Sequence, residues 1–151
     1  IGKTNQFNLT TRRHSEEQVR RMMASDEYWT QYFKLRDRFG DNGLVGVMIA
    51  RRLLAESLTW EIDTWLMSCR VIGRQMEQFM FQNLVEATLV DGVHVIRGVY
   101  IPTAKNALVS DLYPRLGFVK LEEMPGREAH YVLDLTTKDI PRCECIRLRS
   151  A

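Results

Sequence analysis

The sequence predicts one α/β domain with a mixed, mostly antiparallel sheet flanked by helices. Three observations support this class. Several segments alternate apolar and polar residues with the two-residue period of a strand, and others repeat apolar residues with helical spacing. A strand–helix–strand unit spans residues 60–101, and such a unit requires a parallel strand pair joined by a right-handed crossover. The length of 151 residues and the 45% hydrophobic content are ordinary for a single globular domain.

The first half of the chain predicts a strand, a helix and an antiparallel meander. Residues 5–12 alternate polar and apolar side chains. Ser15 begins a helix, because Gln18 completes a capping box with it, and the helix should end near residue 25. The meander should have strands at residues 28–39, 44–54 and 58–68, with turns at residues 40–43 and 55–57.

The second half predicts two helices and three strands. Apolar residues recur at three- and four-residue spacing from residue 73 to residue 89, which is typical of a helix packed on one face. The further elements are expected to be a strand at residues 93–101, a helix at 104–116, and strands at 118–123 and 131–135, with Pro125-Gly126 between the last two.

Charge and cysteine content narrow the classes of partner. Lys and Arg total 21 against 19 Asp and Glu, and a net charge of +2 gives no argument for nucleic acid. No apolar run approaches the roughly 20 residues of a membrane span. Three cysteines without further ligands at zinc spacing predict no metal site and a reducing, cytoplasmic setting. Because the first residue is isoleucine, we expect a fragment of a longer protein.

The turn after residue 68 has the composition of a phosphate-binding loop. A glycine turn that leads into a helix offers unpaired backbone N–H groups and a partial positive charge. Arg70 and Arg74 would add charge-assisted hydrogen bonds. The alternative is a surface turn with two solvated arginines.

Two motifs together resemble the GNAT acyltransferase family over residues 28–135. The first is Arg-x-x-Gly-x before a helix, and the second is Asn106, six residues, Tyr113 and then Leu-Gly-Phe. The resemblance implies a V-shaped opening between residues 61–68 and 93–101 that admits the pantetheine arm of coenzyme A. Asn106 would contact the arm, and Tyr113 would protonate the leaving thiolate. The expected cofactor-binding loop is Arg70, Val71, Ile72, Gly73, Arg74 and Gln75.

Three longer strings resemble the C-terminal part of FkbH-like proteins. They are Thr-Asn-Gln-Phe-Asn-Leu-Thr-Thr-Arg-Arg at residues 4–13, Asp-Arg-Phe-Gly-Asp-Asn-Gly at 37–43 and Ile-Asp-Thr-Trp-Leu-Met-Ser-Cys-Arg at 62–70. In that family a HAD-type phosphatase domain precedes a GNAT-like domain. Its members load a glyceryl group onto an acyl carrier protein for methoxymalonyl-type extender units of polyketides. The resemblance implies that this chain is the C-terminal domain, with the phosphatase domain and the carrier as partners.

Two positions depart from the general GNAT pattern. Gln75 lies where that fold usually has Gly or Ala, and its side chain would crowd a pyrophosphate. Pro114 follows Tyr113 and removes a helix N–H, which could move the tyrosine. A carrier protein presents phosphopantetheine through a single phosphodiester, so these departures favour a carrier-bound arm over free coenzyme A.

The general base and a possible nucleophile have several candidates. Glu61 and Asp63 are two residues apart, point to one face of their strand and could deprotonate an acceptor. Alternatively they form a charged face paired with arginines. Cys69 could accept an acyl group if a helix N-terminus and arginines lower its pKa, or it is a small buried apolar residue. The three histidines have no partner at diagnostic spacing and are expected to be structural or exposed.

Two other functions stay open on the sequence. One is an acetyl-CoA-dependent N-acetyltransferase with Tyr113 as acid and Glu61 or Asp63 as base. The other is a non-catalytic module that only docks the carrier protein.

Overall fold

The computed structural model describes residues 6–56, 58–121, 128–137 and 139–148. The helices are α1 (Glu16–Met23), α2 (Met76–Val90) and α3 (Leu112–Arg115), with short 3-10 helices η1 (Cys69–Val71) and η2 (Ala107–Val109). The strands are β1 (Tyr28–Asp37), β2 (Gly40–Arg52), β3 (Thr59–Met67), β4 (Val95–Tyr100), β5 (Val119–Lys120) and β6 (Ala129–Asp134). They form one six-stranded sheet in the order β1-β2-β3-β4-β6-β5. The predicted α/β class with a mixed, mostly antiparallel sheet is confirmed.

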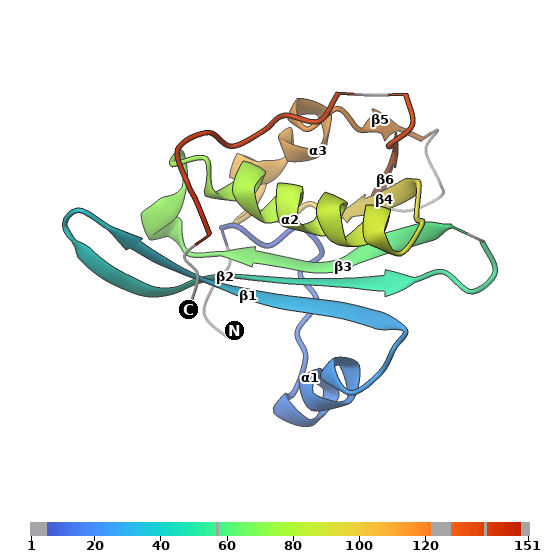
Figure 1. The fold of residues 1–151 in the computed structure, drawn as a ribbon, viewed down its shortest axis with the longest axis horizontal. Helices are drawn as coiled ribbons and strands as arrows, with labels where there is room; N and C mark the ends of the chain where they lie inside the picture. Colours follow the sequence, from blue (N-terminus) through green and yellow to red (C-terminus); the bar gives the residue numbers. More distant parts are fainter. Residues whose placement is uncertain (1–5, 57, 122–127, 138, 149–151) are drawn as a thin grey trace.

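The only parallel pair in the described sheet is β3 with β4, and α2 is the crossover between them. The strand–helix–strand unit expected at residues 60–101 is therefore present. Figure 1 shows α2 and α3 together on one side of the strands, whereas α1 lies apart from them beyond β1.

The core lies between the sheet and α2. Trp65 of β3 is completely buried and stacks on Phe81 of α2, with ring centroids 6.1 Å apart. Gly46 of β2 lets α2 approach closely, because a Cβ atom there would lie 2.6 Å from the sulfur of Met80. Burial of these large apolar side chains is the main stabilising contribution to the sheet–helix contact.

The helix predicted at residues 104–116 is wrong in extent, because two short helices replace it. The buried side chain of Asn106 accepts a hydrogen bond from the N–H of Thr103, so the chain turns tightly there instead of starting a long helix. Pro114 has no N–H to donate to Ser110, and it lies in the first turn of α3, where a proline is tolerated.

Two predictions in the first half also need correction. Residues 6–12 form a single bridge, Asn8 with Leu66, and not a strand, because Thr11 takes a φ of 55° and its N–H binds the side chain of Asn8. The first hairpin turns earlier than expected, at Arg38 and Phe39, because the Asp37 carboxylate accepts hydrogen bonds from the next backbone N–H groups. Ser57, Pro125-Gly126 and the end of the strand predicted at 118–123 lie outside the described residues.

Within the described residues, no helix is long and apolar enough to cross a membrane. In the same ranges, no group of three or more His, Cys, Asp and Glu side chains is placed to hold a metal ion.

Candidate functional site

The parallel strands β3 and β4 separate after three paired positions. Thr59, Trp60 and Glu61 pair with residues 95–97, and β3 then continues to Met67 without pairing further with β4. The predicted opening between residues 61–68 and 93–101 is therefore present. It leaves backbone N–H groups of both strands facing a gap.

The N-terminal residues of the chain fill this gap. We call residues 7–14 the N-terminal strap. The N–H of Met67 donates to the carbonyl of Phe7 at 3.2 Å, and the N–H of Ile101 donates to the carbonyl of Leu9 at 2.9 Å. Phe7, Asn8 and Leu9 are buried, and the Phe7 ring packs edge-on against Trp65. The strap thus bonds to both sides of the opening.

Asn106 is completely buried and contacts the strap beside Ile101. Its side-chain nitrogen donates to the carbonyl of Asn8 at 2.8 Å and to the carbonyl of Ile101 at 2.9 Å. Its side-chain oxygen accepts from the N–H of Thr103 at 2.7 Å. The amide predicted to contact a pantetheine arm therefore contacts the strap in this structure.

Tyr113 lies beneath the opening and is only 1% exposed. Its ring covers β4 at Gly98, where a Cβ atom would lie 2.4 Å from it, and it packs against Trp65, Phe118 and Tyr131. Burial raises the pKa of the hydroxyl far above its ordinary value, as does the charge of Glu61 to a smaller extent. The hydroxyl has no hydrogen bond of good geometry to the described residues, although the backbone at Val99 acts to lower its pKa by more than Glu61 acts to raise it.

The predicted phosphate loop runs from η1 to the start of α2. Val71 is buried and Ile72 packs on the core, and together they anchor the loop. The turn uses left-handed backbone at Gly73 (φ 77°) and at Gln75 (φ 59°), which is the N-cap of α2. The remaining side chains of the loop are exposed: Cys69, Arg70, Arg74 and Gln75.

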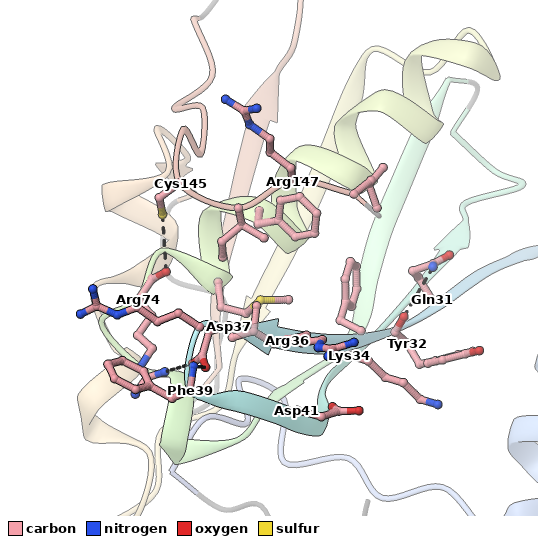
Figure 2. A pocket seen from close by; sticks show the side chains of 17 residues that line it. Gln31, Tyr32, Lys34, Arg36, Asp37, Phe39, Asp41, Arg74, Cys145 and Arg147 are labelled. Atoms are coloured by element: carbon pink, nitrogen blue, oxygen red, sulfur yellow. Dashed lines mark hydrogen bonds and ion pairs between the residues drawn. The ribbon is translucent and has the colours of Figure 1, made fainter. Parts of the chain in front are cut away.

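The C-terminal tail covers this loop. The thiols of Cys143 and Cys145 lie 3.8 Å apart, and that of Cys145 is 3.3 Å from the side-chain oxygen of Gln75. The tail also lines a groove of about 890 Å³ along β1, and Figure 2 shows Cys145 and Arg147 of the tail together with Arg74 around it. The tail and the side chain of Gln75 therefore both lie at the N-terminus of α2.

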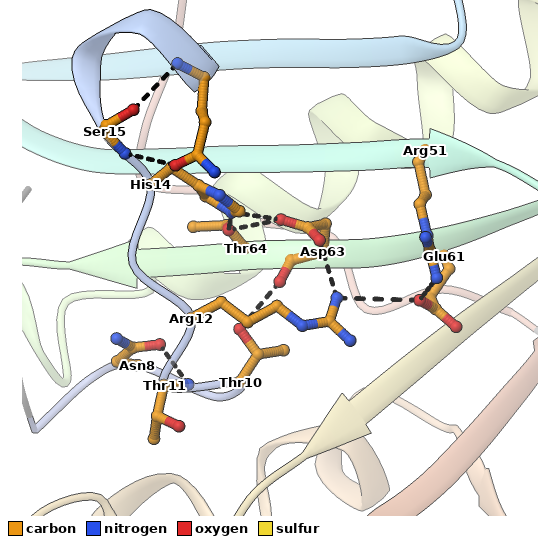
Figure 3. A network of polar contacts seen from close by, with 11 residues as sticks. Asn8, Thr10, Thr11, Arg12, His14, Ser15, Arg51, Glu61, Asp63 and Thr64 are labelled. Atoms are coloured by element: carbon orange, nitrogen blue, oxygen red, sulfur yellow. Dashed lines mark hydrogen bonds and ion pairs between the residues drawn. The ribbon is translucent and has the colours of Figure 1, made fainter. Parts of the chain in front are cut away.

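The carboxylates of Glu61 and Asp63 lie on one face of β3, as predicted, and both are paired. The guanidinium of Arg12 is 2.7 Å from Asp63 and 3.9 Å from Glu61 (Figure 3). The ring nitrogen Nε2 of His14 is 2.7 Å from Asp63, and Arg51 binds Glu61 at 2.8 Å. In this structure the two carboxylates form a charged face paired with arginines, as one of the two interpretations of the sequence expects.

Strand β3 has a β-bulge at Asp63, the residue that makes most of these contacts. The β2–β3 register pairs Ile49 with Thr64 but Ala50 with Ile62, which leaves Asp63 as the extra residue. Bulges redirect side chains, and here the hydroxyl of Thr64 donates to the Asp63 carboxylate at 2.8 Å.

The environment of Asp63 lowers its pKa. Burial alone would raise the pKa, but the hydrogen bonds from Thr64 and His14 and the charge of Arg12 outweigh it. An ionised carboxylate with three partners is a weak proton acceptor. Asp63 is therefore poorly suited to act as a general base, which leaves Glu61 as the other candidate.

The structure brings Glu61, Asp63, Tyr113 and Asn106 around one opening and places Cys69 outside it, exposed at the start of η1. Sequence analysis missed Arg12, His14 and Thr64. Arg12 and His14 are about 50 residues from Asp63 in the sequence, and the alternation of residues 5–12 predicts a strand. The signal that could have found them is the run of polar side chains directly after the apolar part of the strap.

No protein-family model matches this sequence, and no curated protein matches it. Solved structures do resemble its fold. The GNAT domain of S. lividans PAT has a TM-score of 0.66 and 14% identity, over 82% of this chain and 70% of that chain. The ribosomal-protein-S18-alanine N-acetyltransferase from Escherichia coli has a TM-score of 0.57 and 15% identity, over 93% of this chain and 86% of that chain. PaiA N-acetyltransferase from Thermoplasma acidophilum, in complex with coenzyme A, has a TM-score of 0.57 and 13% identity, over 78% and 67%. The chain therefore has the GNAT acetyltransferase fold.

Proposed function

We propose that this chain is the GNAT-like domain of an FkbH-like protein. It handles a glyceryl or similar acyl group on the phosphopantetheine arm of an acyl carrier protein, in the synthesis of methoxymalonyl-type extender units. The observation that carries the proposal is the opening between β3 and β4, with Asn106 and Tyr113 at its sides and the Arg70–Gln75 loop leading into α2.

The surroundings of the loop support a carrier-bound arm over free coenzyme A. Gln75 is the N-cap of α2, and the thiols of Cys143 and Cys145 lie on its side chain. A pyrophosphate would need this space, whereas the single phosphodiester of a carrier-bound arm needs less of it. The N–H groups at a helix N-terminus and the side chain of Arg70 would bind that phosphodiester.

The residues around the opening suggest roles in acyl transfer. Tyr113 would give a proton to the thiolate that leaves when the thioester carbon is attacked. Glu61 would take a proton from the attacking group, directly or through water, because the lowered pKa of Asp63 makes Asp63 a weaker base. Asp63 would not act as the base, since its carboxylate pairs with Arg12 and His14 of the N-terminal strap.

Calorimetric titration with a carrier protein, with and without its phosphopantetheine group, tests the proposal. We expect the phosphopantetheinylated form to bind at least about tenfold more tightly, since only it presents an arm; tenfold corresponds to about 1.4 kcal/mol. Equal affinity of the two forms would reject the proposal. Free coenzyme A is the matched probe for the acetyltransferase alternative, and tighter binding of coenzyme A than of the loaded carrier would favour that alternative.

A second candidate, carrier docking without catalysis, is favoured by the full burial of the Tyr113 hydroxyl. Replacing Tyr113 with Phe separates the two candidates. If the domain is catalytic, acyl turnover should fall at least about tenfold while binding of the carrier is unchanged. If the wild type shows no acyl turnover and both proteins still bind the carrier, docking is the function that remains.

A further inference from the structure

We infer that the N-terminal strap competes with the pantetheine arm for the opening between β3 and β4, so that the arm binds only when the strap leaves. This inference rests on the proposed function and adds a regulated access step to it.

The strap uses the hydrogen-bond donors that an arm would need. Its carbonyls at Phe7, Asn8 and Leu9 accept bonds from the N–H of Met67, the side chain of Asn106 and the N–H of Ile101. A pantetheine arm is an extended chain with two amide groups, and its carbonyls could accept from the same donors. Two chains cannot occupy these donors at once.

The strap also binds the carboxylates of the site. Arg12 spans Glu61 and Asp63, and His14 binds the other oxygen of Asp63 (Figure 3). Tyr113 is buried beneath the opening. With the strap in place, both oxygens of the Asp63 carboxylate are therefore occupied by strap side chains.

The strap has fewer backbone bonds to the sheet than a regular strand, although its Phe7 and Leu9 side chains are buried in the core. It forms one isolated bridge with β3, Asn8 with Leu66, and no regular ladder. Thr11 has a φ of 55°, in a region that β-branched residues rarely adopt, so that the bound strap holds backbone strain. The polar contacts of Arg12 and His14 with Asp63 act against release.

Competition predicts an unusual effect of weakening the strap. If only a fraction of the molecules has an open site, the apparent dissociation constant equals the intrinsic value divided by that fraction. Variants that loosen the strap should therefore bind the arm more tightly. A strap that merely supports the site would have the opposite effect, because its loss would weaken binding.

The test is a calorimetric titration of 4′-phosphopantetheine into three proteins: wild type, the double variant Arg12→Ala/His14→Ala, and the control Arg20→Ala. Arg20 lies on α1 with a 76% exposed side chain, and its removal changes the charge without touching the strap. We expect at least a tenfold gain of affinity in the double variant and no change in the control. Unchanged or weaker binding by the double variant would overturn the inference.

A locked protein keeps the inference testable if the double variant does not fold. Asn8 and Leu66 form a bridge of the non-hydrogen-bonded kind, in which Cα atoms are close enough for a disulfide. In a background with Cys69, Cys143 and Cys145 changed to Ser, the Asn8→Cys/Leu66→Cys protein should bind phosphopantetheine when reduced and at least tenfold more weakly when oxidised. Equal binding in both states would contradict competition.

Hydrogen exchange distinguishes failure of this inference from failure of the proposed function. The N–H of Thr11 is bonded to the side chain of Asn8 within the strap. Saturating phosphopantetheinylated carrier should increase exchange at Thr11 at least tenfold. Arm-dependent binding without this increase would overturn the strap's role and leave the function intact. Absence of arm-dependent binding in the wild type, the double variant and the reduced cysteine pair would reject both.

Discussion

The carboxylate of Asp63 holds together two segments that are distant in the sequence. Arg12 and His14 come from the strap, and Thr64 follows Asp63 on β3. Because the pKa of Asp63 is lowered below its ordinary value of 3.8, the ionised carboxylate stabilises the folded state above about pH 4. This contribution should be lost as the pH falls through the lowered pKa.

Replacing Asp63 with Asn should therefore destabilise the protein in a pH-dependent way. We expect a loss of about 1 to 3 kcal/mol in the free energy of unfolding at pH 7, as for a removed charged hydrogen-bond partner. The difference between the two proteins should shrink below about pH 4, which urea unfolding at several pH values would measure. Asp37 and Asp134 also have lowered pKa values, but they are present in both proteins. A difference that stays constant with pH would contradict the assigned network.

Individual residues differ in how far the sequence could predict them. The shared face of Glu61 and Asp63 follows from the period of a strand, and the structure confirms it. Their partners Arg12 and His14 do not follow from any period, since they depend on the path of the strap across β3. Only the motif identifies Tyr113 in the sequence, and its complete burial depends on the absence of a side chain at Gly98.

Helix α1 is the element with the clearest local cause. The hydroxyl of Ser15 accepts from the N–H of Gln18, and the side chain of Gln18 accepts from the N–H of Ser15. None of its residues is buried, so capping and the pairs Glu16–Arg20 and Glu17–Arg21 carry much of its stability.

Replacing Ser15 with Ala should fray α1 without unfolding the sheet. The expected cost is about 1 kcal/mol, confined to the helix. Amide hydrogen exchange should accelerate roughly fivefold at Gln18, with no change in the amides of β3. Exchange that accelerated equally in α1 and β3 would show that α1 unfolds together with the sheet.

Elements were predictable where local pattern and tertiary packing agree. The apolar spacing of α2 and the capping box of α1 identified both helices, and β1 to β3 follow from alternation. The helix expected at 104–116 failed because Asn106 bonds to the distant Asn8 and a neighbouring turn. The strand expected at 5–12 is absent from the described residues. This segment lies in the gap between β3 and β4 and does not pair along a sheet edge.

At the scale of the whole molecule, the first and the last described segments of the chain both lie at the candidate site. The strap fills the opening between β3 and β4, and the tail with Cys143 and Cys145 covers the start of α2. Neither arrangement has a local sequence pattern, because each is determined by which surface of the finished fold remains uncovered. The fold could be predicted from the sequence, whereas this occupation of its site could not.

The central claim is that a carrier-bound arm enters the opening between β3 and β4. The most direct measurement is the difference in amide chemical shifts between complexes with the phosphopantetheinylated carrier and with its apo form. The account predicts arm-dependent shifts at the N–H groups of Met67 and Ile101 and at the side-chain amide of Asn106, which now bond to the strap or its flank. Identical shifts in the two complexes, or arm-dependent shifts confined to the groove along β1, would contradict it.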